Sequence, residues 1–144
     1  DFEGSLWRFP AEVMKNDNEH LKPMSRQTKE LLIDLQSITG HGKFVFPGDR
    51  NPDNPMSNNT LLYGGIYRMG YKGQAHIHGF RALQSTILNE SGRFNPDAIE
   101  REQARTDKNK VRAIYNRAEY LNERREMIQW YADHLDGLKS KAKQ

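Results

Sequence analysis

The sequence has 144 residues, which is the size of a single domain and enough to bury a substantial core. Lysine and arginine number 22 against 19 acidic residues, so the net charge of +3 permits nucleic-acid binding without requiring it. Cysteine is absent, which excludes disulfides, thiolate catalysis and cysteine-based zinc sites.

Two features of the chain bear on its location and completeness. No apolar run approaches the roughly 20 residues that span a bilayer, and the N-terminus lacks a signal-peptide pattern. We therefore expect a cytoplasmic protein without a membrane partner. The first residues, Asp-Phe-Glu-Gly-Ser, do not resemble a natural start, so we expect the chain to begin inside a longer protein.

The N-terminal residues predict a β-hairpin. Residues 5–10 alternate between apolar and polar side chains, and residues 20–24 predict a second, edge-like strand because Pro23 cannot donate to a ladder. The polar residues 14–19 between them favour a turn, with Lys15 near its tip. Considered alone, a lysine in such a turn is more often simply solvated.

A helix is predicted next, from the N-cap residue Ser25 to a stop at Gly40. Its apolar positions form a helical stripe, which predicts core scaffold: Leu31, Leu32, Leu35 and Ile38. The short apolar run Phe44–Phe46 is expected to add a strand to the sheet of the hairpin.

A second helix is predicted from Ser57 or Asn58 to Gly70. The pair Gly64-Gly65 inside it costs about 1 kcal/mol per glycine relative to alanine. Either a helix or DNA backbone approaches closely there, or the helix is irregular.

Three further helices are predicted in the second half. The first has four residues facing inward: Phe80, Leu83, Ile87 and Leu88. The second starts at Asn95-Pro96-Asp97 and runs to about Arg105. The last is amphipathic, runs from Glu119 to Leu138, and is expected to pack on its own domain. The predicted fold is α+β, mainly α, with a small antiparallel sheet.

His78 and Arg81 lie three residues apart at the start of a helical segment, so both side chains leave from one face. A cation and an imidazole aimed together suggest an anion site. Each residue singly has a plainer explanation, a structural histidine and a surface ion pair. His76 and His78 would point the same way on a strand, but no acidic neighbour completes a metal site, so we expect no metal.

Tyr115 lies four residues after Val111 and three before Ala118, a spacing that is more often that of a buried aromatic residue, but the cations around it favour a functional phenol. Cations bind DNA phosphates and lower the cost of ionising a phenol, whose reference pKa is about 10. Four of them surround Tyr115: Lys108, Lys110, Arg112 and Arg117.

Several motifs occur in order along the chain: Lys15 in a hairpin, His78-Gly-Phe-Arg81, Ala104-Arg105, Val111-Arg-Ala-Ile-Tyr-Asn-Arg-Ala-Glu-Tyr-Leu, and the following Glu-Arg-Arg and Gln-Trp-Tyr-Ala-Asp-His-Leu. Together they resemble the catalytic domain of the tyrosine recombinases, and more narrowly the integrases of prophages and genomic islands. The resemblance covers nearly the whole chain and keeps the order of the motifs.

The resemblance implies a role for each matching residue. Tyr115 would attack a scissile phosphate, forming a 3′-phosphotyrosyl link and releasing a 5′-hydroxyl. Arg81 would hold the non-bridging oxygens, His78 would transfer a proton or hydrogen-bond the phosphate, and Lys15 would protonate the leaving oxygen. Neither ATP, a metal nor another cofactor would be required.

The chain departs from the family at Arg105, where histidine or tryptophan is usual. Arginine cannot release a proton at working pH, although it can donate hydrogen bonds to a phosphate. The basic residues 108, 110, 112 and 117, together with His76, are expected to contact DNA.

The family also has an arginine upstream of the hairpin, which this chain does not contain. We therefore expect residues 1–144 to form a partial catalytic domain, without its upstream DNA-binding domains and inactive by itself. The full-length protein would act on double-stranded DNA attachment sites as a homo-tetramer, whereas the isolated segment would be monomeric. The final helix or the tail Lys139–Gln144 would dock on a neighbouring subunit.

Two alternatives remain open from the sequence. The chain could be a non-catalytic DNA-binding protein or decayed integrase remnant that uses the same basic face. It could also share the chemistry of a type IB topoisomerase that nicks and closes DNA, although the flanking motifs favour an integrase.

Overall fold

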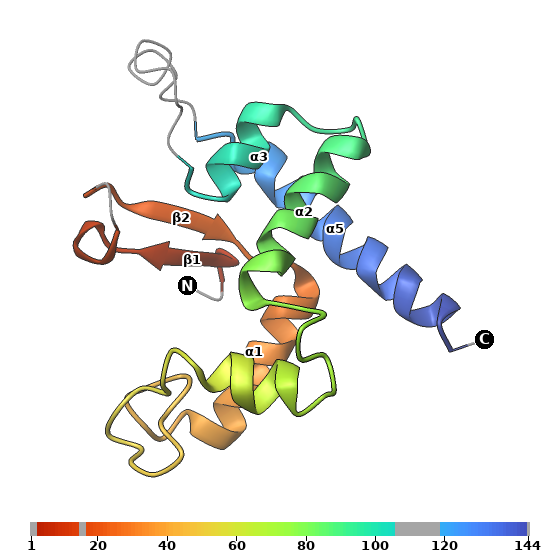
Figure 1. Ribbon diagram of the computed structural model, residues 1–144. Coiled ribbons are helices and arrows are strands. Elements are labelled where there is room, and N and C mark those ends of the chain that lie inside the picture. The colour runs from red at the N-terminus through yellow and green to blue at the C-terminus, as the bar shows by residue number, and fades with distance from the viewer. Residues whose placement is uncertain (1–2, 15–16, 106–118, 144) are drawn as a thin grey trace. The chain divides into compact units, whose positions relative to one another are not determined.

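The computed structural model describes residues 3–14, 17–105 and 119–143, which form a mainly helical chain with a small antiparallel sheet (Figure 1). The α+β fold class predicted from the sequence is therefore confirmed. The chain divides into two compact units, one made of Asp1–Lys29 with Gln84–Gln144 and the other of Glu30–Leu83. We call them the hairpin unit and the central unit.

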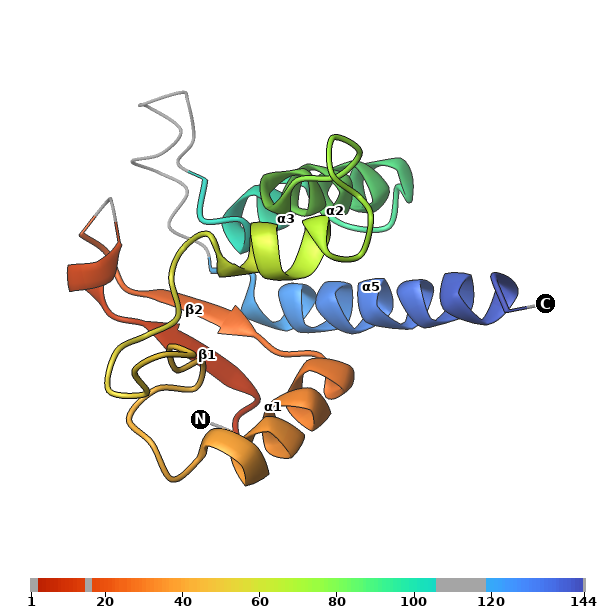
Figure 2. The same cartoon turned by 60° about the horizontal axis from the view of Figure 1, so that its bottom comes forward.

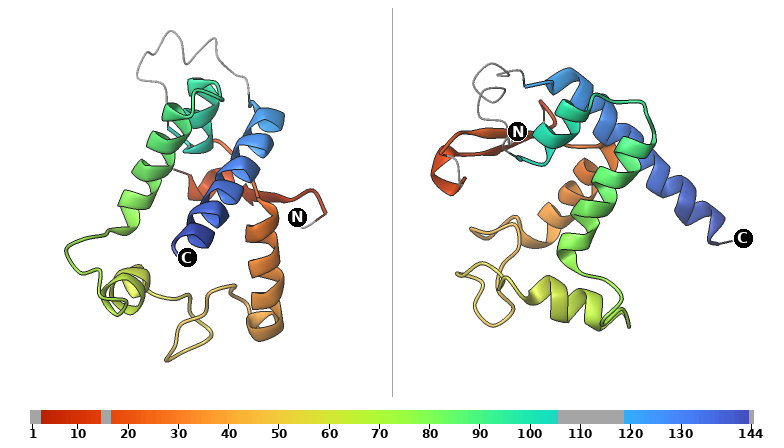
Figure 3. Two further views of the ribbon diagram at one scale, coloured as in Figure 1. Left: turned by 90° about the vertical axis from the view of Figure 1, so that its right-hand side faces the viewer. Right: turned by 45° about the horizontal axis from the view of Figure 1, so that its top comes forward.

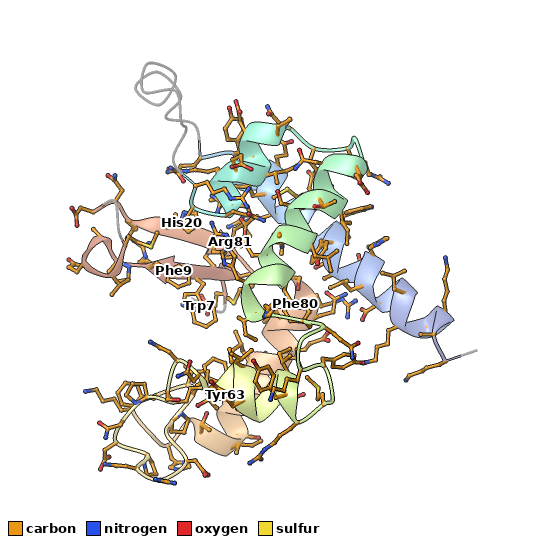
Figure 4. The ribbon with its side chains drawn as sticks, in the orientation of Figure 1. Trp7, Phe9, His20, Tyr63, Phe80 and Arg81 are labelled. Atoms are coloured by element: carbon orange, nitrogen blue, oxygen red, sulfur yellow. The ribbon has the colours of Figure 1, made fainter. Side chains whose placement is uncertain are left out.

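The predicted β-hairpin is present in the hairpin unit. Strands β1 (Leu6–Phe9) and β2 (His20–Pro23) pair antiparallel, with Leu6 opposite Pro23 and Phe9 opposite His20. A short 3-10 turn, η1 (Ala11–Val13), follows β1. The rings of Trp7 and Phe9 stack 5.7 Å apart because alternate residues of a strand share one face (Figure 4).

The core of the hairpin unit lies between helices. Helix α3 (Pro96–Glu102) packs on α5 (Leu121–Lys141), and α5 also packs on β2 (Figure 2). Leu88 near the end of α2 (Ile77–Glu90) is buried with Ile99 and Met127, and aromatic residues surround this cluster. The C-terminal turns of α5 project away from α3, and Leu135 and Leu138 there are exposed.

Helix α3 starts as the sequence predicts. The Oδ1 atom of Asn95 accepts a hydrogen bond of 2.9 Å from the N–H of Asp97, and Pro96 occupies the first turn. Its predicted end at Arg105 is wrong, because the helix stops at Glu102. Ala104 has a φ of +49°, a left-handed conformation that a helix cannot contain.

Helix α1 (Arg26–Thr39) also starts as predicted, since the N–H of Thr28 donates to Ser25 Oγ at 3.2 Å. The prediction that its apolar stripe forms core is wrong. No residue of α1 is buried, and Leu31 and Ile38 are 69% and 66% exposed. Helical periodicity identifies the apolar face of a helix but not whether another element covers that face.

The predicted strand Phe44–Phe46 is also wrong, because these residues lie in the loop between α1 and the next helix (Figure 3). A single bridge joins Pro47 and Pro55, flanked by a 2.9 Å hydrogen bond from Met56 N to Phe46 O. Both bridge residues are prolines and lack an N–H, so they cannot extend a ladder.

The glycine pair lies in a π-helix, η2 (Leu61–Tyr67), which is preceded by Thr60 and not capped by Ser57 or Asn58. Among the described residues, no side chain or backbone lies within 4 Å of a Cβ built on Gly65. The helix that contains the pair is therefore irregular, and the space beside Gly65 is open. The rings of Tyr63 and Tyr67 meet edge to face, with centroids 5.2 Å apart.

Only part of the apolar face predicted for helix α2 is buried. Leu88 is buried and Ile87 is half-buried, as predicted. Phe80 and Leu83, which the sequence predicts to face inward, are instead 52% and 48% exposed. The burial of α2 is confined to the end that packs in the hairpin unit.

Candidate functional site

His78 and Arg81 lie in the first turns of α2, in the central unit, and both are exposed. Residues three apart on a helix leave from the same face, so the predicted pairing on one face follows from the observed helix. The first turn of α2 contains no acidic residue. A cation such as Arg81 near a helix N-terminus faces the positive end of the helix dipole, an arrangement that a bound anion would stabilise.

His76 directly precedes α2, and its carbonyl oxygen accepts a 2.9 Å hydrogen bond from the N–H of Gly79. His78 thus lies in a helix, as the sequence predicts, and the strand geometry that would aim His76 and His78 in one direction is not present. Among the described residues, no group of three or more histidine, cysteine or acidic side chains could hold a metal ion.

Arg105 lies in the hairpin unit, where its guanidinium pairs with a carboxylate. Nη1 of Arg105 is 2.8 Å from Oε1 of Glu100, and its backbone N–H donates to the carbonyl oxygen of Glu100 at 3.1 Å. Both side chains are more than one third exposed, so this pair contributes little stability.

Six of the residues predicted for the site or for DNA contact lie outside the described residues: Lys15, Lys108, Lys110, Arg112, Tyr115 and Arg117. Glu119 directly follows residues 106–118 and pairs with Arg101 of α3. The Nε of Arg101 donates to Glu119 Oε2 at 3.3 Å. This ion pair holds Glu119, which follows residues 106–118, next to Arg101, which precedes them.

A cluster of charged residues is buried where β2, α3 and α5 meet. Arg124 and Glu102 are fully buried and paired at 2.8 Å, and the ammonium of Lys22 lies 3.5 Å from the second oxygen of Glu102. Burial raises the pKa of Glu102, and the charges of Lys22 and Arg124 oppose that rise.

Sequence reasoning did not identify this cluster, although a signal for Arg124 was present. Arg124 follows Tyr120 by four residues and precedes Met127 by three, so it falls on the apolar stripe of the last helix. A charged residue on an apolar face needs a buried partner. The sequence offers no comparable sign for Glu102.

His20 lies beside the cluster, and its Nε2 has no hydrogen-bond partner among the described residues. Burial, followed by the charges of Arg124, Arg101 and Lys22, lowers the pKa of His20 to about 4. A hydrogen bond with the backbone of Glu102 works in the opposite direction. His20 is therefore neutral at neutral pH.

The hairpin unit also contains an open, largely apolar groove of about 410 Å³. Side chains from β1, from β2 and the residue after it, and from α5 line it, among them Trp7, Phe9, Met24, Ile128, Tyr131 and Leu135. Burial raises the pKa of Tyr131. Within the part of the chain that the structure describes, no helix is long and apolar enough to cross a membrane.

Comparison with known proteins adds independent information. No family model and no solved structure matches the chain. Prophage integrase IntZ of Escherichia coli strain K12 is 46% identical over 138 residues, which cover 96% of this chain and 34% of that protein. The integrase of Enterobacteria phage P4 is 40% identical over 98% of this chain and 35% of its own length.

The integrase of Shigella phage Sf6 is also similar, with 45% identity over 94% of this chain and 35% of that protein. The chain thus spans about a third of the length of the curated relatives it matches. Identities of 40% or more over nearly the whole chain mean common descent rather than a shared motif. The chain therefore belongs to the phage integrase family.

Proposed function

We propose that the chain is part of a tyrosine-type site-specific recombinase that integrates and excises DNA through a covalent 3′-phosphotyrosyl intermediate. The observation that carries the proposal is the placing of His78 and Arg81 on one exposed helical face, in a chain related to integrases. The relatives are named integrases, and the order of the motifs around Tyr115 supports the tyrosine type.

In the proposed reaction the oxygen of Tyr115 attacks the scissile phosphorus and the bond to the 5′ oxygen breaks. Arg81 holds the non-bridging oxygens, because a guanidinium presents paired donors that match phosphate geometry. His78 hydrogen-bonds the phosphate or transfers a proton, and Lys15 protonates the leaving 5′ oxygen. The phosphotyrosyl bond conserves the energy of the phosphodiester, so rejoining would need neither ATP nor a metal.

The setting of α2 makes Arg81 a suitable phosphate ligand. It is exposed, lies one turn into a helix whose first turn has no acidic residue, and is joined there by an imidazole. His76 precedes the same helix and is proposed to contact the DNA backbone, together with the basic residues between 108 and 117.

One observation favours the alternative of a non-catalytic remnant. Arg105 occupies the position at which histidine or tryptophan would be expected, and its guanidinium pairs with Glu100. A paired arginine cannot relay a proton. In an active enzyme Arg105 would instead exchange Glu100 for a phosphate oxygen when DNA binds.

A covalent trapping assay separates the two functions. Full-length protein would be incubated with a nicked suicide substrate that carries the attachment site, and the protein-linked DNA would be resolved on a denaturing gel. The parent protein and a Tyr71→Phe control, in which an exposed tyrosine is replaced, are expected to form the adduct, whereas Tyr115→Phe is expected to form none. An adduct that persists in Tyr115→Phe, or its absence from the parent protein, would refute the enzymatic proposal.

Assembly and location are further parts of the proposal. The full-length protein would work in the cytoplasm as a tetramer on paired attachment sites, with the C-terminal end of α5 or the tail Lys139–Gln144 docked on a neighbouring subunit. The exposure of Leu135 and Leu138 supports a role of this end in assembly. Deletion of residues 139–144 is expected to weaken synapsis in a gel-shift assay of paired sites, and unchanged synapsis would exclude the docking.

A further inference from the structure

Arg124 is a fully buried cation that links three separate parts of the hairpin unit. Its Nε donates to Glu102 of α3 at 2.8 Å, and its Nη1 donates to the backbone oxygen of Glu119 at 3.1 Å. Its Nη2 donates to the backbone oxygen of Leu21 in β2. These acceptors lie on the strand that returns from the hairpin tip and on either side of residues 106–118.

The shape of the guanidinium makes this linkage rigid. The group is planar and its five N–H donors have fixed directions, so three acceptors bonded to it are also fixed relative to one another. A lysine ammonium has no such fork and cannot replace it. A second link runs through the same carboxylate, because Lys22 of β2 lies 3.5 Å from Glu102. Strand β2 is thereby held in a defined position relative to Glu119.

Stability alone accounts poorly for this arrangement. Replacing a buried ion pair by apolar residues of similar volume is often neutral or stabilising, because two desolvated charges gain little net free energy. A hydrophobic pair at positions 102 and 124 would join α3 to α5 equally well. Such a hydrophobic pair would not bind the backbone oxygens of Leu21 and Glu119. These two hydrogen bonds are the contacts that fix the position of β2 relative to Glu119.

We infer that Arg124 is a positioning residue for DNA strand cleavage. It holds the base of the hairpin that carries Lys15 against Glu119, four residues after Tyr115. The inference rests on the proposed function, in which the ionised oxygen of Tyr115 bonds to phosphorus, the bond from phosphorus to the 5′ oxygen breaks, and the ammonium of Lys15 gives its proton to that oxygen. A displaced hairpin would leave this oxygen without its acid.

The experiment compares two leaving groups in single-turnover cleavage by the full-length protein. One suicide substrate has the ordinary scissile phosphodiester, and the other has sulfur in place of the bridging 5′ oxygen. A thiolate is a weak base and leaves without being protonated, so the second substrate does not need Lys15. The test protein carries Arg124→Met with Glu102→Leu, which removes both buried charges together and keeps similar volumes.

The matched control is Arg125→Met. Arg125 is the next residue of α5, and its Nη2 donates to the backbone oxygen of Gly4 at 3.3 Å on the exposed surface. The control is expected to cleave both substrates at the parent rate. Arg124→Lys serves as a second test variant, because it keeps the buried positive charge beside Glu102 but cannot hold all three acceptors.

Both test variants are expected to melt close to the parent protein and to bind attachment-site DNA with the parent affinity. They should cleave the ordinary substrate on the order of tenfold to a hundredfold more slowly, because a misplaced acid loses much of its contribution. The sulfur substrate should restore cleavage to within about threefold of the parent rate. A purely structural role would not produce this difference between the leaving groups.

Two results would overturn the inference. The first is a folded variant that cleaves the ordinary substrate at the parent rate, and the second is equal slowing on both substrates, since sulfur would relieve a defect in the acid. If the double variant does not fold, Arg124→Lys decides by the same comparison. If the parent protein forms no Tyr115 adduct, the proposed function fails and the positioning role falls with it, which distinguishes the two failures.

Discussion

The ion pair between Arg101 and Glu119 joins the end of α3 to the residue that precedes α5 by two positions. Its side chains are 34% and 45% exposed, so solvent screens their attraction. Arg101 lies near the end of α3, a helix whose start is capped by the side chain of Asn95. The pair therefore holds Glu119 beside α3 without contributing much to stability.

The first prediction concerns this exposed pair. Glu119→Gln is expected to lower the free energy of unfolding by less than about 1 kcal/mol, because exposed ion pairs are worth little and the backbone oxygen of Glu119 still accepts from Arg124. Urea unfolding of this variant, of Arg101→Gln and of the double variant gives the coupling energy. A coupling of about 2 kcal/mol or more would show that the pair is not screened as its exposure indicates.

The second prediction concerns the buried pair of Arg124 and Glu102. Removing either charge alone, by Arg124→Met or Glu102→Leu, is expected to cost about 3–5 kcal/mol because an uncompensated charge stays buried. The double variant is expected to cost much less than the sum of the two. Urea unfolding of the three variants measures this, and additive losses would mean that the two charges do not depend on one another.

The third prediction is a pH dependence from His20. Its pKa is about 4 in the folded protein and near 6.5 when unfolded, so the unfolded state binds a proton more readily. The contribution of His20 to stability is complete above pH 6.5 and decreases by up to about 3 kcal/mol as the pH falls towards 4.

The check is urea unfolding at pH 7, 5.5 and 4.5 for the parent protein and for His20→Gln, whose amide does not titrate in this range. The variant is expected to lose less stability on acidification. Glu102 acts with the opposite sign, since its raised pKa favours the folded state at low pH, and it contributes equally to both proteins. Parallel curves for the two proteins would refute the assignment.

The fourth prediction concerns Arg81 and depends on the proposed function. Arg81→Gln in the full-length protein is expected to slow formation of the phosphotyrosyl adduct by roughly 100- to 1,000-fold, the cost of one lost donor to a developing charge. Arg68→Gln is the control, because Arg68 is also exposed and lies in the same unit. Equal rates for the two variants would remove Arg81 from the site.

Local chemistry in the sequence determined much of this structure. The alternation in residues 5–10 predicts β1, which is present. The capping residues Ser25 and Asn95 mark the observed starts of α1 and α3. Residues 78 and 81, which are spaced as on a helix, lie in α2. Each of these features depends on contacts within a few residues, and such contacts are present whatever the rest of the chain does. The identities of the proposed catalytic residues likewise came from motifs read along the chain.

Tertiary structure decided which apolar faces are covered and which charges are buried. Leu31 and Leu88 lie on similar helical stripes, yet the first is exposed and the second is fully buried because only the second meets other helices. Arg124 contacts Leu21 across 103 residues of sequence, a relationship that no local pattern encodes. Burial and ion pairing depend on elements brought together from distant parts of the chain, so the sequence identified the chemical groups and the fold decided which of them meet.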